Sequence, residues 1–227
     1  MLKVAVQDEE KAGAALMAWW QGDGAARVLA YDGAALLLER AESGTALADM
    51  ARNGRDEEAS QIICAVISKL HTPRPERPPP VVDLSRWFQG LEASATAHGG
   101  IFAMARATAR ELLAAPRDVR VLHGDMHHDN VLDFGRRGWL AIDPKGLVGE
   151  RGFDYANIFC NPDAETAVGQ ERFPHRVDVV AAAAGLERRR LLKWILAWAG
   201  LSASWHIEDG SMPDTSLIVA QMALAEL

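Results

Sequence analysis

The sequence predicts an α+β fold in which a small N-terminal part carries strands and a larger part is mainly helical. Two observations indicate this class. Short apolar runs at residues 2–6, 26–32 and 34–40 have the length of strands, whereas apolar residues further along recur mostly at helical spacing. A dense group of polar residues interrupts the helical pattern at residues 121–146, between short runs that read as strands. A cleft between two lobes is one arrangement that fits this layout.

The N-terminal elements follow from local signals. Residues 9–20 place apolar residues at helical spacing, with acids in the first turn where the helix dipole favours them. The pair Asp32-Gly33 is a strong turn signal and predicts a hairpin between the second and third strands. We expect the small part to span residues 1–40, with a hinge near residues 38–41.

The larger part, residues 41–227, is expected to be helical apart from the polar segment. Amphipathic patterns predict helices at residues 45–54 and 57–71. A proline-rich connector at residues 72–80 cannot continue a helix. Residues 83–115 read as two helices, and the chain after the polar segment is dominated by helical patterns.

Composition narrows the function classes. With 24 basic and 31 acidic residues the formal charge is −7, which argues against nucleic acid as a partner because such binding needs a basic face. No apolar run reaches the roughly 18 residues that span a bilayer, and the N-terminus lacks the pattern of a secretion signal. We therefore expect a cytoplasmic protein without a membrane partner. Cys64 and Cys160 lie far apart and outside any CxxC pair, so we expect them to be buried and reduced.

The stretch VLHGDMHHDNVLDFGRRGWLAIDPKG holds four acidic residues, three histidines and an asparagine within residues 121–146. One interpretation is a site for phosphoryl transfer, which needs alignment, magnesium and a carboxylate near the acceptor hydroxyl. Asp125 can accept a proton from an alcohol, and Asn130 can turn its amide oxygen to a metal ion. Asp143 ends the next strand and can bind the same ion, since oxygen ligands suit magnesium.

The alternative interpretation is a zinc site at His123, His127 and His128. Zinc ligands spaced four residues apart belong on one face of a helix, but Gly124 and Asp125 disfavour a helix here and no HExxH glutamate is present. We therefore favour the magnesium interpretation. His123, directly before the Gly-Asp pair, is expected to brace the loop.

The segments HGDMHHDN and AIDPKG together resemble the catalytic and metal-binding loops of the aminoglycoside phosphotransferases. The stretch IDPKGLVGERGFDYANIFCNP narrows the resemblance to the branch with streptomycin and hydroxyurea phosphotransferases, and similarity runs along nearly the whole chain. The resemblance implies a two-lobed protein-kinase-like fold. It also implies an antibiotic-resistance kinase that uses ATP and Mg to phosphorylate a hydroxyl of a small molecule.

The resemblance implies roles for residues of both parts. Asp125 would be the catalytic base, Asn130 and Asp143 would bind magnesium, and Lys3 would contact the nucleotide phosphates. Asp154 would be a buried aspartate that supports the catalytic loop, although sequence alone fits a helix N-terminal acid equally well.

The resemblance also implies that the nucleotide binds to the hinge near residues 38–41. The backbone of Leu38, Glu39 and Ala41 would contact adenine, and Lys145 could bring its ammonium group near the phosphates.

Two features depart from the family. Family members carry two strands and a phosphate-covering loop before the lysine strand, whereas this chain begins two residues before Lys3, so we expect a truncated N-terminal β lobe. The centre of the following helix lacks the glutamate that should pair with this lysine. Glu9 and Glu10 near the helix start are alternative partners, or they only favour the helix terminus.

We expect the acceptor to bind beside Asp125, in a pocket formed by residues 83–115 and the C-terminal helices. It could be cationic; Glu208 and Asp209 are candidates to receive a positive group, or they are solvated loop residues. Aromatic residues could line the pocket or belong to the core: Trp87, Phe88, Trp194, Trp198 and Trp205. An amino-alcohol or sugar kinase, and a catalytically weak nucleotide-binding protein, remain the rival hypotheses.

Overall fold

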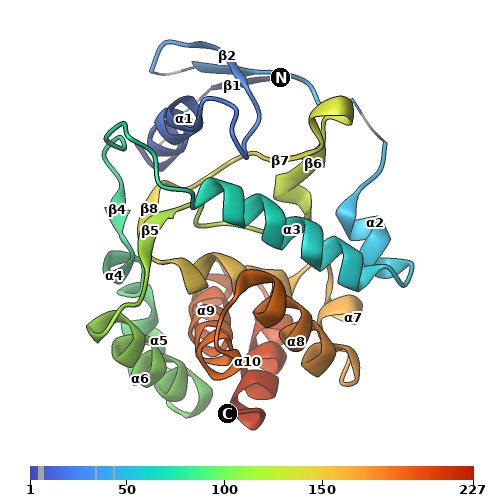
Figure 1. Cartoon of the computed structure of the whole chain (residues 1–227). Coiled ribbons are helices and arrows are strands. Elements are labelled where there is room, and N and C mark those ends of the chain that lie inside the picture. The colour runs from blue at the N-terminus through green and yellow to red at the C-terminus, as the bar shows by residue number, and fades with distance from the viewer. Residues whose placement is uncertain (5–7, 34, 43) are drawn as a thin grey trace.

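A computed structural model describes residues 1–4, 8–33, 35–42 and 44–227 of the chain, without the side chains of residues 8 and 9. Three small sheets and ten α-helices form the described part, which confirms the predicted α+β class. The small N-terminal sheet lies at one end, and most of the helices lie beyond the central helix α3, with the C-terminus at the far end (Figure 1).

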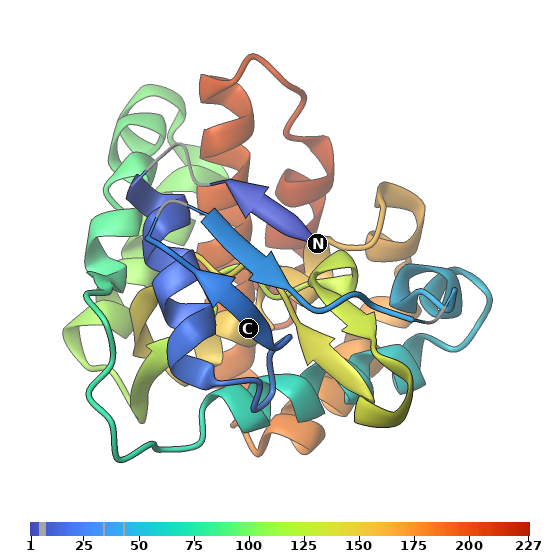
Figure 2. The same ribbon diagram turned by 90° about the horizontal axis from the view of Figure 1, so that it is seen from above.

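The N-terminal sheet packs on one helix. Its strands are antiparallel in the order β1-β3-β2, and it lies over α1 (Figure 1; Figure 2). Leu36 and Leu38 are buried on the inner face of β3, whereas Leu37 between them is exposed, as the two-residue period of a strand requires. The elements are β1 (Leu2–Val4), α1 (Asp8–Trp20), β2 (Val28–Tyr31) and β3 (Ala35–Leu38).

The predicted hairpin between the second and third strands is confirmed. Its turn begins at Asp32, whose carboxylate accepts the N–H of Ala35 at 2.7 Å. Strand β2 is shorter than predicted because Ala26 donates its N–H to Ala141 at 2.9 Å instead of continuing the hairpin. The small sheet is thereby tied to the polar segment. The predicted continuation of the first strand through residues 5 and 6 lies outside the described residues.

The helical part differs from the prediction in one place. Residues 83–115 form three helices rather than two: α4 ends at Trp87 before α5 begins, and positive φ angles at Gly99 and Gly100 separate α5 from α6. The helix α9 is buried along most of its length and packs against α6 and α10. The helices are α2 (Leu47–Arg52), α3 (Asp56–Leu70), α4 (Leu84–Trp87), α5 (Gly90–His98), α6 (Gly100–Ala114), α7 (Ala164–Ala167), α8 (Arg172–Ala184), α9 (Arg188–Glu208) and α10 (Asp214–Ala225).

The polar segment is built on two short sheets. Strands β4 (Val82–Asp83), β8 (Leu147–Glu150) and β5 (Val119–Leu122) form one sheet in that order. Strands β6 (Val131–Asp133) and β7 (Trp139–Ala141) form an antiparallel ribbon, as the loop, strand, turn and strand pattern predicted. The sequence analysis missed β4 and β8, because runs of two and four residues carry little periodicity.

Two further expectations concern burial and the membrane. Both cysteines are free; Cys64 is buried as predicted, but Cys160 is only half-buried, which corrects that expectation. Among the helices that the structure describes, none combines the length and apolar character that a bilayer span requires. The boundary between the two parts at residue 40 stays a prediction.

Candidate active site

The loop that carries Asp125 follows strand β5 and rests on a buried carboxylate. Asp154 accepts the backbone N–H groups of His123 at 2.9 Å and of Gly124 at 2.8 Å. The ring Nε2 of His71 lies 2.8 Å from the same carboxylate. Asp154 is 1% exposed, so water cannot hydrogen-bond to its carboxylate, and these protein donors take the place of water. The contacts favour the loop-supporting role for Asp154 over that of a helix N-terminal acid.

Glycine is needed at the turn directly before Asp125. Gly124 has a φ of 88°, in the left-handed region that side chains disfavour. A Cβ atom there would lie 2.9 Å from the side chain of Leu147. The backbone N–H of Lys145 donates to the carbonyl of His123 at 2.7 Å, so the loop after β7 packs directly against this turn.

His123 joins the two loops through its ring. Its Nδ1 accepts the backbone N–H of Asp125 at 3.2 Å, and its Nε2 lies 2.8 Å from the carbonyl oxygen of Ile142, to which it donates. Burial lowers the pKa of His123, so the ring is neutral near pH 7. These contacts fit the expected bracing role. They also leave neither ring nitrogen for a zinc ion, and no group of three His, Cys, Asp or Glu side chains in the described part of the chain is arranged to hold a metal.

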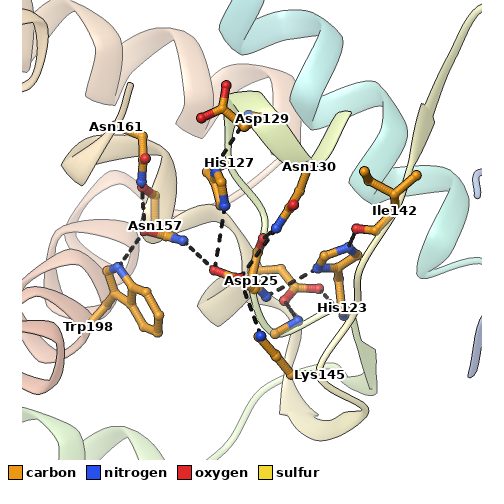
Figure 3. Close-up of polar contacts among 12 residues, drawn as sticks. His123, Asp125, His127, Asp129, Asn130, Ile142, Lys145, Asn157, Asn161 and Trp198 are labelled. Carbon is orange, nitrogen blue, oxygen red and sulfur yellow. Dashed lines mark hydrogen bonds and ion pairs between the residues drawn. The ribbon is translucent and has the colours of Figure 1, made fainter. Parts of the chain in front are cut away.

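The carboxylate of Asp125 is surrounded by donors (Figure 3). Its Oδ1 accepts the Nδ2–H of Asn157 at 3.0 Å, and its Oδ2 lies 3.3 Å from Nδ2 of Asn130. Two further nitrogen atoms lie at a greater distance: Nζ of Lys145 is 3.9 Å from Oδ2, and Nε2 of His127 is 3.9 Å from Oδ1. The side chain of Asp125 is 25% exposed, so a small molecule can reach it.

The two residues assigned to magnesium lie at the same end of the β6–β7 ribbon. The N–H of Ile142 donates to the carbonyl of Asn130 at 2.9 Å, so Asp143 follows directly beside Asn130. The Nδ2 group of Asn130 donates to the carbonyl of Asp125 at 2.7 Å and to its carboxylate, so Oδ1 is the atom that could bind a metal ion. A carboxylate and an amide oxygen fit magnesium, which keeps several waters and phosphate oxygens as further ligands.

The backbone at Asp143 has an unusual conformation. Its φ of 63° lies in the left-handed region, which few residues other than glycine adopt and which recurs at functional sites. The helix α1 packs on the next residue so closely that a Cβ atom at Gly13 would lie 2.0 Å from the carbonyl oxygen of Pro144. The absence of a side chain at Gly13 therefore lets α1 reach this loop.

A cavity of about 330 Å³ lies between the small sheet, α1 and the loop after β7. Lys3 forms an ion pair with Asp143 inside it, so the structure brings the predicted phosphate contact to a predicted metal ligand. Glu10 also lines this cavity, whereas the side chain of Glu9 lies outside the description. Apolar side chains cover the remaining wall: Ala14, Met17, Leu36, Leu38 and Ile142.

The hinge residues differ in position. Leu38 lines the cavity, and both of its backbone groups are bonded to Met1, at 2.8 Å through its N–H and 2.7 Å through its carbonyl. Glu39 donates its N–H to the carbonyl of Arg27 at 3.0 Å. Neither Glu39 nor Ala41 is among the described residues that line the cavity. Their contact with adenine stays a prediction.

A second cavity of about 580 Å³ opens on the other side of Asp125. Lys145 lines it together with Asp125, so this lysine lies on the side away from Lys3. Of the residues considered for an acceptor pocket, Phe88 and Trp194 are core residues, 5% and 0% exposed. The described lining residues are Trp87, Asp125, His127, Lys145, Asn157, Asn161, Trp198, Ser202 and Trp205.

The expected acidic groups for a cationic acceptor are absent from this lining. Glu208 and Asp209 are exposed at the end of α9 and are not among the described residues that line the cavity, which favours solvated residues over a site for a positive group. Asp125 is the one carboxylate among the described lining residues. Trp87 and Trp205 meet edge to face, with ring centroids 5.2 Å apart.

Asn157 and Asn161 were not predicted as site residues from the sequence. Asn157 donates to Asp125, and its own Oδ1 accepts from Asn161 at 2.9 Å and from the indole of Trp198 at 3.0 Å. The available signal was the stretch FDYANIFCNP, in which two asparagines interrupt an apolar run. Such residues in a buried segment need hydrogen-bond partners, which could have drawn attention to them.

The chain is similar to enzymes that phosphorylate small molecules. Residues 1–210 match the family described as aminoglycoside/hydroxyurea antibiotic resistance kinases. The streptomycin 3''-kinase of Klebsiella pneumoniae is 53% identical over 215 residues, which cover 92% of this chain and 80% of that protein. The hydroxyurea phosphotransferase of Kitasatospora aureofaciens is 34% identical over 239 residues, which cover 98% of this chain and 67% of that protein.

A solved structure shares the fold. The aminoglycoside phosphotransferase APH(3'')-Id from Streptomyces rimosus, in complex with ADP and streptomycin, matches with a TM-score of 0.60 and 21% identity. The match covers 88% of this chain and 85% of that chain. The likeness confirms the protein-kinase-like fold that the sequence predicts.

Proposed function

The chain belongs to the aminoglycoside/hydroxyurea antibiotic resistance kinase family, and we propose that it transfers the γ-phosphoryl group of ATP to the 3''-hydroxyl of streptomycin. It is a phosphotransferase with an alcohol group as acceptor. The choice of streptomycin over hydroxyurea rests on 53% identity to a streptomycin 3''-kinase, against 34% to a hydroxyurea phosphotransferase.

One observation carries the proposal. The residues Asp125 and Asp143 line two different cavities, and the loops that hold them are joined by the bond from the His123 ring to the carbonyl of Ile142 and the bond from the N–H of Ile142 to the carbonyl of Asn130. Transfer between two substrates requires a nucleotide and an acceptor to meet in line. An arrangement with one cavity on each side of the joined loops suits that requirement.

In the proposed mechanism Asp125 orients the acceptor hydroxyl and takes up its proton. The acceptor oxygen bonds to the γ-phosphorus, and the bond from that phosphorus to the β–γ bridging oxygen breaks, so that ADP leaves. Lys3 holds the nucleotide phosphates, and Lys145 reaches the transferred phosphoryl group from the acceptor side as a point charge. Asn130 and Asp143 would hold magnesium, which offsets the charge of the phosphates.

The aromatic wall suits a cationic acceptor. Cations bind to the faces of tryptophan rings, and Trp87, Trp198 and Trp205 all line the acceptor cavity. We place the activity in the cytoplasm, where ATP is available. The net charge of −7 suits a cationic drug better than a nucleic acid.

The test is acceptor-dependent ADP release. The purified protein is incubated with ATP, magnesium and one acceptor at a time: streptomycin, hydroxyurea, choline or a simple sugar. We expect release with streptomycin, and product mapping by NMR should locate the phosphate on the 3''-oxygen. Turnover of choline or sugar alone would support the rival metabolite kinase, and nucleotide binding without any turnover would support the binding-protein hypothesis.

A further inference from the structure

We propose that Asn157 is a positioning residue, which holds the carboxylate of Asp125 so that its Oδ2 receives the proton of the acceptor hydroxyl. This inference rests on the proposed function, because it assigns an atom to the base of that reaction. Asn157 is 8% exposed and lies between Asp125 and the aromatic wall of the acceptor cavity (Figure 3).

The orientation of the Asn157 amide is determined by its neighbours. Its Oδ1 accepts two donors, the indole N–H of Trp198 at 3.0 Å and Nδ2 of Asn161 at 2.9 Å. Asn161 is itself anchored, because its Nδ2 also donates to the carbonyl of Asn157 at 3.0 Å. If the amide were flipped, its NH₂ group would face the two donors of Trp198 and Asn161, and its oxygen would face the carboxylate of Asp125. The NH₂ group must therefore face Asp125.

The two oxygens of Asp125 consequently differ. Oδ1 is engaged by Asn157 at 3.0 Å. Among the described residues, the contacts of Oδ2 are longer, with Nδ2 of Asn130 at 3.3 Å and Nζ of Lys145 at 3.9 Å. An incoming hydroxyl donates most readily to the oxygen whose lone pairs are least engaged. That oxygen is Oδ2, on the side of Lys145.

The same network links the base to the acceptor cavity. Trp198, Asn161 and Asn157 all line this cavity. Loss of the indole N–H of Trp198 removes one of the two donors that orient the Asn157 amide. The rotation of Asp125 is therefore controlled by the wall against which the acceptor lies.

A purely structural role for Asn157 predicts a different result from a positioning role. A structural residue affects the free energy of unfolding and leaves kcat of the folded protein unchanged. A positioning residue affects kcat, while the KM for the acceptor and the binding of ADP are unchanged. Asn157→Leu separates these cases, because leucine has nearly the size of asparagine but cannot donate a hydrogen bond to Asp125.

The experiment measures kcat, the KM for the acceptor and the binding of ADP for wild type, Asn157→Leu and Trp198→Phe. We expect kcat to fall about 10- to 100-fold in Asn157→Leu, with the KM and ADP binding near those of wild type. Trp198→Phe keeps a ring but loses the donor and should lower kcat less. Asn53→Leu, the same change at an exposed position, is the matched control and should behave as wild type.

The proposal is overturned if Asn157→Leu folds, binds ADP and keeps the kcat of wild type. A substrate-free measurement separates this outcome from failure of the proposed function. In the NMR spectrum at one pH, Asp125→Asn should shift the side-chain NH₂ signals of Asn157, whereas Asp129→Asn should leave them in place. Unshifted signals in Asp125→Asn would sink the proposal even if no acceptor were found.

Discussion

The carboxylate of Asp154 accepts the backbone N–H of Gly124 at 2.8 Å, so a side chain 30 residues further along the chain holds the residue directly before Asp125. Asp154 is nearly inaccessible and has a second backbone donor in His123. Positioning of the proposed base thus depends on one buried carboxylate.

Removal of this carboxylate should affect both stability and turnover. Asp154→Ala leaves two backbone N–H groups without their acceptor, which should lower the free energy of unfolding by about 3 kcal/mol. We expect kcat to fall as well, because the loop before Asp125 loses its anchor. Urea unfolding and initial rates measure the two effects. Asp129→Asn, an exposed acid in the same loop, should change neither; equal stability of Asp154→Ala and wild type would contradict the assignment.

Asp125→Asn should abolish turnover and retain nucleotide binding. The amide keeps the size of the side chain but cannot take up a proton, and loss of a general base costs about 10²- to 10⁴-fold in kcat. Calorimetry with ADP should give a binding constant near that of wild type. Substantial turnover by this variant would exclude Asp125 as the base.

The two lysines should act on different steps. Lys3 lies in the cavity of Asp143, so Lys3→Ala should weaken ADP binding by about tenfold or more. Lys145 lies beside Asp125, so Lys145→Ala should lower kcat by about 10²-fold and change ADP binding little. Calorimetry measures ADP binding, and rapid kinetics measures the phosphoryl-transfer step, so the two effects can be separated. Weaker ADP binding in Lys145→Ala with unchanged kcat would assign this lysine to the nucleotide side instead.

The aromatic wall should bind the charged acceptor. A cation on a tryptophan face contributes about 0.5–2 kcal/mol, so Trp87→Ala should raise the KM for streptomycin by about 2- to 30-fold. The KM for ATP should stay constant, because Trp87 lines only the acceptor cavity among the two described here. Trp19→Ala, outside both cavities, is the control. An unchanged KM in Trp87→Ala would show that this ring does not contact the acceptor.

A buried ion pair should make the fold sensitive to acid. Burial opposes the charge on Glu150, but hydrogen bonds from Arg190, Trp194 and the N–H of Arg117 outweigh it and lower the pKa of this carboxyl. Its contribution to stability is therefore present above the unfolded pKa of about 4.3 and is lost as pH falls through the lower folded pKa.

Glu150→Gln tests this contribution directly. At pH 7 the variant leaves a buried guanidinium without its partner, at a cost of about 3–5 kcal/mol in unfolding free energy. The difference from wild type should shrink as the pH falls below about 4, because wild type then loses the same charge. Glu58→Gln, in an exposed pair with Arg55, should have little effect at any pH. A difference that stays constant with pH would contradict the ion-pair explanation.

Much of the site could be predicted because its residues lie in short, continuous segments. Asp125, Asn130 and Asp143 fall within one stretch of 26 residues, in which strand signals surround hard oxygen ligands. The ribbon of β6 and β7 joins the segments over a short distance, so spacing along the chain was a fair guide to spacing in the fold. The hairpin at Asp32 was predictable for the same reason.

The features of the site that could not be predicted depend on contacts between segments far apart in the sequence. The ion pair of Lys3 with Asp143, 140 residues away along the chain, was not predicted from the sequence. Five aromatic residues could not be distinguished by pattern, and only the structure shows that Trp87, Trp198 and Trp205 line the cavity whereas Phe88 and Trp194 do not. Helical periodicity cannot make this distinction, because α9 is buried on nearly all of its faces.

The sequence by itself determined the α+β class, the kinase family and the chemical identity of the groups in the polar segment, since these depend on local patterning and on residue type. Only the tertiary structure decided which oxygen of Asp125 is engaged, on which side Lys145 lies and what supports the loop. Those features arise where α1, the β6–β7 ribbon and α9 pack together, and the partners that satisfy a buried polar group can come from any part of the chain.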